Sequence, residues 1–240
     1  MTSLISRQDC IFPQSYFEAV LASHDEHHWN FFDLCGCPQS LVIFLIELAN
    51  LAAEKQKASS MRSVVFDTTL FSPIESSLES WCYPFSQAGF YDEESMQQYQ
   101  DAMHCSEAWR HGLVLYIYRV FRWEPGMDVP VHITFRARVV LDHVFACRDD
   151  GFVGRQALLP LFLAGCELTD QSSRTRITDF CASCSQRTGY HMFNTAIPLL
   201  EEVWADQEVR GFNSVWWGQI VDRWHSASSD QSLPLRITFG

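Results

Sequence analysis

Apolar residues recur every three or four positions along most of this chain, which is the spacing of one face of an α-helix. The first clear stripe follows Pro38, and proline is well tolerated at the first position of a helix. The stripe consists of Leu41, Phe44, Leu45, Leu48 and Ala52. It stops at the polar run KASS, so the pattern predicts a helix from Pro38 to about Lys57.

The middle of the chain predicts two longer helices. One runs from about Glu93 to Trp123 through the apolar segment AWRHGLVLYIYRVFRW and is stopped by EPG. The next begins near Pro130 and ends at CRDDG. Its apolar face consists of Ile133, Ala137, Val140 and Val144. Between residues 58 and 92, serine, proline and glycine interrupt the pattern and predict short helical pieces joined by loops.

The last third of the chain predicts further helical elements. The segment ALLPLFLAGCELTD is apolar enough for a central buried helix. The next helix has Thr169 or Asp170 as its N-cap and ends at Gly189. The segment YHMFNTAIPLLEEVWADQE has the cleanest amphipathic pattern, and SVWWGQIVDRWH adds a short element.

Alternation of apolar and polar residues with a period of two is nearly absent, and no internal repeat occurs at a fixed period. The sequence therefore predicts an all-α fold, with one multi-helix domain over residues 31–240. We expect residues 1–30 to form a flexible segment, and the tail LPLRITFG to form a short irregular piece or strand.

Composition narrows the classes of function. The net charge is −12, which opposes direct contact with the phosphates of a nucleic acid. The longest apolar runs, LVIFLI and LLPLFLA, are far shorter than a bilayer span, so we expect no membrane contact. Nine cysteines in a chain without an export signal favour reduced thiols inside a cell.

The sequence lacks the common signatures of catalysis. It contains no G-x-S-x-G nucleophile motif, no G-x-G-x-x-G motif and no P-loop. Asp149 and Asp150 in RDDG suggest an acidic magnesium site, but one isolated pair is better explained as the turn that ends a helix. We therefore expect neither enzymatic activity nor a cofactor.

The segment FCASC offers the most suggestive metal ligands. Cys181 and Cys184 lie in it, Cys166 lies upstream and His191 downstream. A closed zinc site needs four ligands, and these four would come from three different predicted helices. Both thiols of FCASC share an apolar stripe with Ile177, and cysteine is among the residues most often buried. Packed thiols are therefore favoured over a zinc site.

Two other short segments contain metal-ligand types. The patch HDEHHWN holds His24, His27 and His28, but it lacks the glutamate position of a hydrolytic zinc helix. A solvated, flexible patch is favoured there. Cys35 and Cys37 in LCGCP are more typical of a turn ahead of a helix than of a metal site.

Glu167 follows eight residues that are almost wholly apolar, so its carboxylate is expected either to pair with an arginine or to emerge at the end of the helix. The candidate partners are Arg110, Arg119 and Arg174. An ion pair that fixes the register of neighbouring helices is favoured over a general acid, because no histidine or second carboxylate accompanies Glu167 in the sequence.

Several segments, in order, resemble the fungal-specific transcription factor domain, a regulatory domain found C-terminal to the binuclear zinc-cluster DNA-binding motif. They are FFDLCGCPQSLVIFLIELANLAAE, AWRHGLVLYIYRVF, LLPLFLAGCELTDQSSRTRI and RTGYHMFNTAIPLLEEVW, followed by Trp216 or Trp217. These blocks run from about residue 30 to residue 225. The motif residues that the resemblance marks are Gly165, Cys166, Glu167, Arg174 and Trp204.

This resemblance implies an α-helical regulatory domain in the nucleus that acts on RNA polymerase II transcription, often of a metabolic or biosynthetic gene cluster. The implied partners are proteins of the transcription machinery or a homo- or heterodimer partner. The resemblance also leaves a small-molecule effector open. We expect no direct nucleic acid contact by this chain.

One departure from the family pattern concerns the zinc cluster. The first hundred residues offer Cys10, Cys35, Cys37 and Cys82, without the spacing or the basic run of such a cluster. We expect either a fragment or truncated product of a longer regulator, or a stand-alone regulatory domain that acts through other proteins.

Two alternatives stay open beside this interpretation. A small helical enzyme of a biosynthetic pathway would use a metal at the His24–His28 patch or at Asp149 and Asp150. An orphan helical scaffold would have no activity of its own.

Overall fold

The computed structural model describes residues 2–10, 13, 15–17, 32, 35–61, 63–84, 92–148, 156–189 and 192–228. Within these ranges every regular element is a helix and no strand occurs, so the predicted all-α fold class is confirmed. The tail LPLRITFG, predicted as a short irregular piece or strand, lies outside the described residues.

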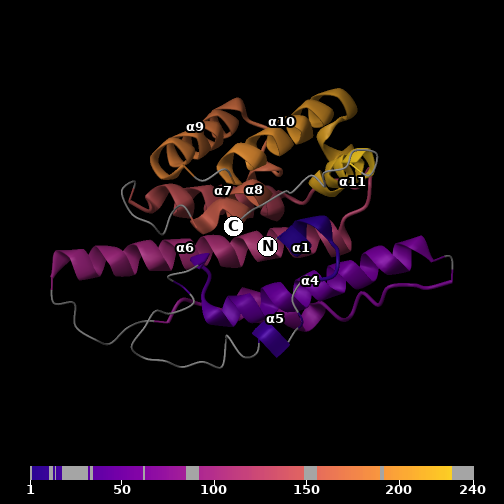
Figure 1. The fold of residues 1–240 in the computed structure, drawn as a ribbon, viewed down its shortest axis with the longest axis horizontal. Helices are drawn as coiled ribbons and strands as arrows, with labels where there is room; N and C mark the ends of the chain where they lie inside the picture. Colours follow the sequence, from indigo (N-terminus) through magenta and orange to yellow (C-terminus); the bar gives the residue numbers. More distant parts are fainter. Residues whose placement is uncertain are drawn as a thin grey trace.

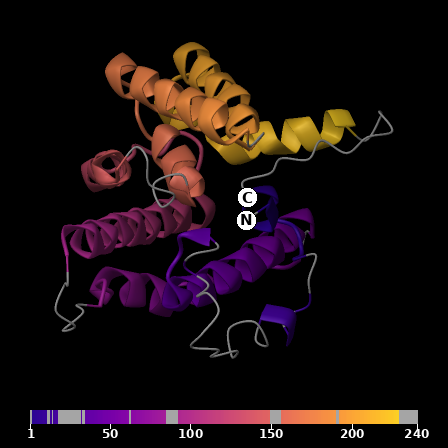
Figure 2. The ribbon, with the colours of Figure 1, turned by 60° about the vertical axis from the view of Figure 1, so that its left-hand side comes forward.

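The helices are stacked in layers around one long central helix (Figure 1). This helix, α6, lies between α4 and α5 on one side and α7 and α8 on the other, and α9 and α10 form the outer layer beyond α8 (Figures 1 and 2). The bounds are α4 Gln39–Ser60, α5 Ser72–Ser80, α6 Glu93–Ile117, α7 Val131–Ala146, α8 Leu158–Gly165, α9 Gln171–Thr188, α10 Met192–Arg210 and α11 Trp217–Ser228.

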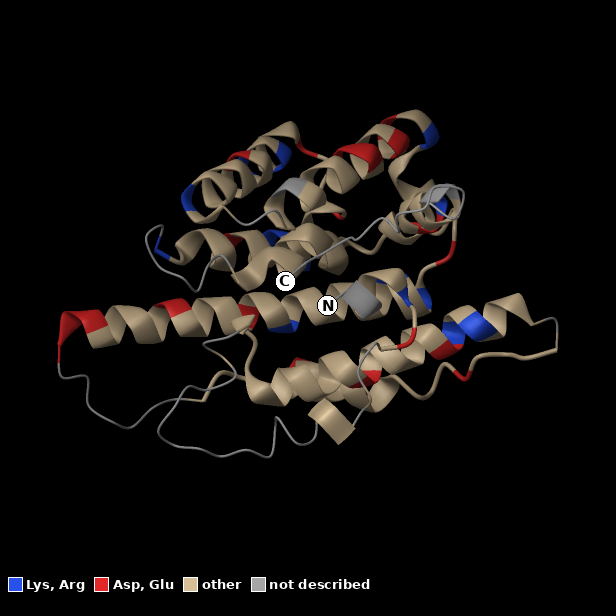
Figure 3. Ribbon diagram, viewed as in Figure 1, with Lys and Arg blue, Asp and Glu red and all other residues tan. Residues whose placement is uncertain are grey.

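The core of the molecule surrounds the C-terminal half of α6. Trp109, Leu113 and Tyr116 on this helix are fully buried. Gly112 lies where α6 crosses α8, and a Cβ atom there would be 3.0 Å from Pro160 Cα. The missing side chain therefore allows the two helices to approach closely. The charges follow this arrangement (Figure 3). Acidic residues lie at the N-terminal end of α6, away from the core, and α8, which packs on the core, carries no charged residue.

Local sequence signals set several helix ends. The Asp92 carboxylate accepts a hydrogen bond from the Ser95 amide at 2.7 Å and caps α6. Asp170 caps α9 in the same way, and Gly189 ends α9 with a positive φ of 68°. Gly189 was predicted as this end, and of the two predicted N-cap candidates, Thr169 and Asp170, the structure selects Asp170. The helix after Pro38 continues to Ser60, three residues beyond the predicted end at Lys57.

The predicted helix from Glu93 to Trp123 changes its geometry before it ends. After Ile117 the chain continues as a π-helical turn, η1, over Tyr118–Arg122. Its wider hydrogen-bonding pattern is seen where the Trp123 amide donates to Tyr118 O at 2.9 Å, five residues back. The apolar pattern does not reveal this change, because a π turn keeps the same apolar composition.

The first residues of the chain differ from the flexible segment that was expected there. Thr2–Ser6 form a short helix, α1, which contacts α4 and α11. Leu4 and Ile5 are buried, and the Tyr116 hydroxyl donates a hydrogen bond to Leu4 O at 2.8 Å. A helix of little more than one turn is too short to give a periodic pattern, so only the tertiary contacts reveal it.

Candidate functional site

The turn that follows α8 is the meeting point of the motif residues. The last carbonyls of a helix have no partner within the helix and must find one elsewhere. Here Gly165 O accepts a hydrogen bond from Trp204 Nε1 at 2.9 Å, and Cys166 O accepts one from Gln207 Nε2 at 2.8 Å. Side chains of α10 therefore complete the end of α8.

Further contacts of the motif residues fix the same turn. Arg174, on α9, donates from Nε to Leu168 O at 3.3 Å and from Nη1 to Glu208 Oε1 at 2.9 Å. A Cβ atom on Gly165 would lie 3.0 Å from the Leu200 side chain, so glycine allows α10 to pack directly on the end of α8. The motif thus joins α8, α9 and α10 through one turn.

Glu167 forms the buried ion pair that the sequence predicted. Arg119, one of the three candidate arginines, donates from Nε to Oε1 at 2.6 Å and from Nη2 to Oε2 at 2.8 Å. The two side chains are 2% and 1% exposed. Such a two-point contact orients both groups and joins η1 to the turn after α8.

The surroundings of Arg119 keep it charged. Burial alone lowers the pKa of the guanidinium, but the Glu167 carboxylate more than offsets this, so the pKa of Arg119 is raised. Its guanidinium also lies over the Trp123 ring, 4.8 Å from the centroid, and over the Phe212 ring at 5.4 Å. The arrangement supplies packing and a fixed charge.

The cysteines proposed as metal ligands are all buried thiols. Cys181 and Cys184 lie on the core face of α9 beside Ile177, as predicted, and Cys166 lies at the end of α8. Burial raises the pKa of Cys181 to about 12 and raises that of Cys166 well above the usual value. The thiols of Cys181 and Cys166 therefore stay protonated at neutral pH. His191, the fourth candidate, lies outside the described residues.

The remaining predicted candidates have different outcomes. His24, His27 and His28 lie outside the described residues, as do Asp149 and Asp150, so those hypotheses stay predictions. Cys35 and Cys37 lie in the turn that precedes α4. Burial raises the pKa of both thiols, more strongly for Cys37.

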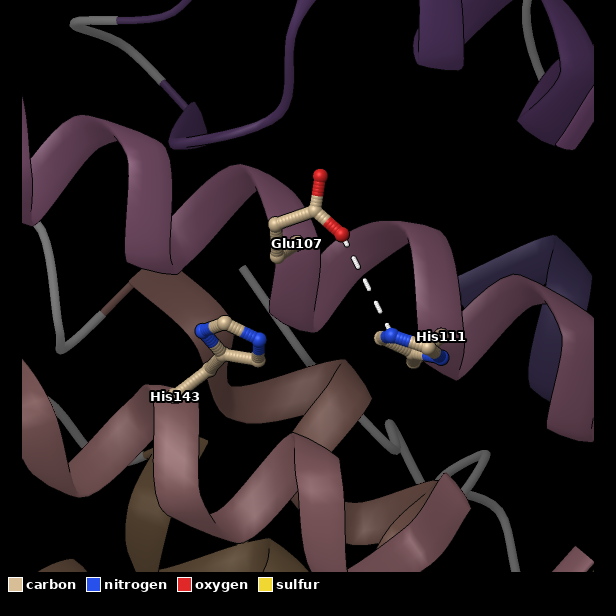
Figure 4. Close-up of side chains that lie close together, drawn as sticks. All are labelled: Glu107, His111 and His143. Carbon is tan, nitrogen blue, oxygen red and sulfur yellow. Dashed lines mark ion pairs between the residues drawn. The ribbon is translucent and has the colours of Figure 1, made fainter. Parts of the chain in front are cut away.

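A separate group of polar side chains joins α6 to α7. Glu107 and His111 lie one turn apart on α6, and His143 faces them from α7 (Figure 4). Each residue offers one ligand atom, and these atoms all lie within 4.8 Å of one another. Among the residues that the structure describes, this is the one group of three or more such side chains arranged so closely.

We call Glu107, His111 and His143 the α6–α7 cluster. Further polar residues surround it. His104 Nδ1 is 2.9 Å from His143 Nδ1, and Arg110 Nε donates to Glu107 Oε2 at 2.7 Å. Burial, followed by the charges of Arg110 and Arg136, lowers the pKa of His111 to about 3. Burial also lowers the pKa of His143. Both imidazoles are therefore neutral near pH 7.

The α6–α7 cluster was not identified from the sequence, although part of its signal is visible there. In HCSEAWRH, His104, Glu107 and His111 are spaced by three and four residues, which puts them on one face of a helix. His143 lies on another helix, and the sequence alone does not place it opposite that face. Gln207 was missed for the same reason, since its partner Cys166 is brought to it only by tertiary packing.

Comparison with known proteins gives one finding for the whole chain. The family model described as "Fungal specific transcription factor domain" matches residues 1–231. No curated protein and no solved structure matches the chain significantly. In the described part of the chain, no helix combines the length and the apolar character that crossing a membrane requires.

Proposed function

Since the chain belongs to the fungal specific transcription factor domain family, we propose that it is a nuclear regulatory domain of RNA polymerase II transcription that acts through contacts with other proteins. Membership of this family implies a role in transcription regulation, and the family is typically non-enzymatic. The observation that carries the proposal is the match over residues 1–231, which covers nearly all of the 240-residue chain. Control of a metabolic or biosynthetic gene cluster is part of the proposal.

The charge of the chain supports contact with proteins over contact with DNA. A net charge of −12 repels a phosphate backbone, whereas association with DNA relies on lysines and arginines that displace its counterions. The chain has only two lysines, Lys55 and Lys57. The Lys55 ammonium donates a hydrogen bond to Val120 O at 2.6 Å, so it contacts the protein's own backbone.

Exposed apolar side chains support the same proposal. Val131 and Phe135 lie one turn apart on α7 and are 85% and 64% exposed, and Met127 precedes them on the surface. Apolar groups that gather on a surface mark sites of contact with other macromolecules. A homodimer partner, a heterodimer partner or a protein of the transcription machinery would each suit such a surface.

An electrophoretic mobility-shift assay tests the part of the proposal that concerns DNA. At low salt, where electrostatic binding is strongest, the purified chain is expected to show no sequence-specific shift of promoter DNA. A basic DNA-binding domain in the same gel serves as the positive control. Tight, sequence-specific binding by the chain alone would overturn the view that it acts through other proteins.

A further inference from the structure

We propose that Glu107, His111 and His143 bind one divalent metal ion of the Zn²⁺ type between α6 and α7 (Figure 4). The inference goes beyond the proposed function and stands on the α6–α7 cluster alone. Imidazole nitrogen and carboxylate oxygen are the ligands that Zn²⁺ takes beside thiolate, and three protein ligands leave one position open for a further group.

The backbone positions the three side chains suitably for one ion. Glu107 and His111 are separated by one helical turn, and their Oε2 and Nε2 atoms are 3.9 Å apart. Ligands at about 2.0–2.2 Å from a tetrahedral ion are about 3.3 Å apart, so this pair needs to close by about 0.6 Å and any other pair by at most about 1.5 Å. The α6–α7 cluster bridges two helices that pack along much of their length.

Neighbouring side chains hold the ligands in orientation. Metal-bound histidines usually have their second ring nitrogen fixed by a hydrogen bond. His143 Nδ1 is 2.9 Å from His104 Nδ1, which leaves Nε2 of His143 for an ion. Arg110 contacts both Glu107 Oε2 and His111 Nε2, so its guanidinium must move aside when an ion binds these two atoms.

The positive charges of two arginines beside the cluster repel a cation, and carboxylates paired with these arginines reduce that repulsion. Arg110 pairs with Glu107, and Arg136 pairs with Glu79, so each positive charge has a carboxylate beside it. Arg110 Nη2 and Arg136 Nη1 lie 2.9 Å and 3.2 Å from the two ring nitrogens of His111. A neutral imidazole accepts a hydrogen bond at only one nitrogen and carries a hydrogen on the other. At one of the two contacts, an arginine N–H therefore faces the imidazole N–H. Without an ion, one of these two contacts to His111 is therefore not a hydrogen bond.

Titration of the full chain with Zn²⁺ tests the site. The chain is first treated with a chelator and kept in a reducing agent, and binding is followed by calorimetry. We expect one ion per chain at this site and a loss of affinity of about 100-fold or more in His111→Gln, because a ligand is removed. His132→Gln is the matched control, since His132 is exposed on the same helix as His143 and lies outside the cluster.

A second variant makes the test independent of a loss of folding. Arg136→Gln removes a positive charge beside His111 and is expected to tighten Zn²⁺ binding by about threefold or more. Circular dichroism of each variant confirms that the helices are kept. Binding that is equal in the parent chain, His111→Gln and Arg136→Gln would overturn the proposal.

Replacement of Zn²⁺ by Co²⁺ distinguishes this site from one made by the nine cysteines. Ligation by nitrogen and oxygen gives weak visible bands, and thiolate ligation adds an intense charge-transfer band in the near ultraviolet. We expect the weak bands alone, and their loss in His111→Gln. An intense thiolate band that persists in His111→Gln would place the ion elsewhere and contradict the proposal.

Discussion

Replacing Glu167 with alanine is expected to lower the free energy of unfolding by about 3–5 kcal/mol, because it leaves the Arg119 guanidinium buried without a counter-charge. Arg119 is 2% exposed, so water does not take the place of the carboxylate. A domain is stable by only about 5–15 kcal/mol in total. The variant is therefore expected to lose a large part of its free energy of unfolding, which urea unfolding followed by circular dichroism measures.

Two further variants separate the ion pair from simple loss of contacts. Arg119→Met combined with Glu167→Leu is expected to be more stable than either single variant, because an apolar pair can replace a buried ion pair of similar volume. Arg223→Ala serves as a surface control. Arg223 is 49% exposed and pairs with Glu202, so its loss is expected to cost less than about 1 kcal/mol. Equal costs for Glu167→Ala and Arg223→Ala would contradict the account of this pair.

Trp217→Ala is expected to have a similarly large effect, about 3–5 kcal/mol, through the cavity that it leaves in the core. The Trp217 ring is fully buried and stacks on the Tyr116 ring, with 5.9 Å between centroids. Phe162 packs edge-on against it at 6.4 Å, and Arg7 lies over its face. One side chain thus joins α11 to α6, α8 and the segment after α1.

Thermal unfolding of Trp217→Ala, compared with a second tryptophan variant, measures this contribution. Trp81 is only partly buried, and its indole donates a hydrogen bond to the Ser40 hydroxyl at 3.0 Å. Trp81→Ala is expected to be the less destabilised of the two. If Trp81→Ala unfolded at a lower temperature than Trp217→Ala, the central role given to Trp217 would be wrong.

The features that were predicted correctly depend on local chemistry. Gly189 was identified as the end of α9, and Asp170 as one of two candidate N-caps beside Thr169, because a polar cap and a glycine stop act on their own backbone. The core face of α7 followed from its apolar period, and all four of its predicted residues are buried. The pairing of Glu167 with an arginine followed from the cost of burying an unpaired charge.

The features that were missed depend on contacts between distant segments. The sequence offered three arginines for Glu167, and only the packing of η1 against the turn after α8 selects Arg119. Helix α1 is too short for a periodic pattern, so its burial was not predicted. The α6–α7 cluster needs His143 from a second helix, and sequence spacing does not specify how two helices face each other.

The most direct measurement of the central claim tethers the chain to DNA through a heterologous DNA-binding domain and measures a reporter gene in fungal nuclei. We predict that the fusion changes reporter transcription several-fold relative to the DNA-binding domain alone. The same fusion carrying Glu167→Ala is predicted to lose this effect, because its fold is destabilised. Reporter output that equals that of the DNA-binding domain alone, with the fusion present at normal levels, would contradict the account.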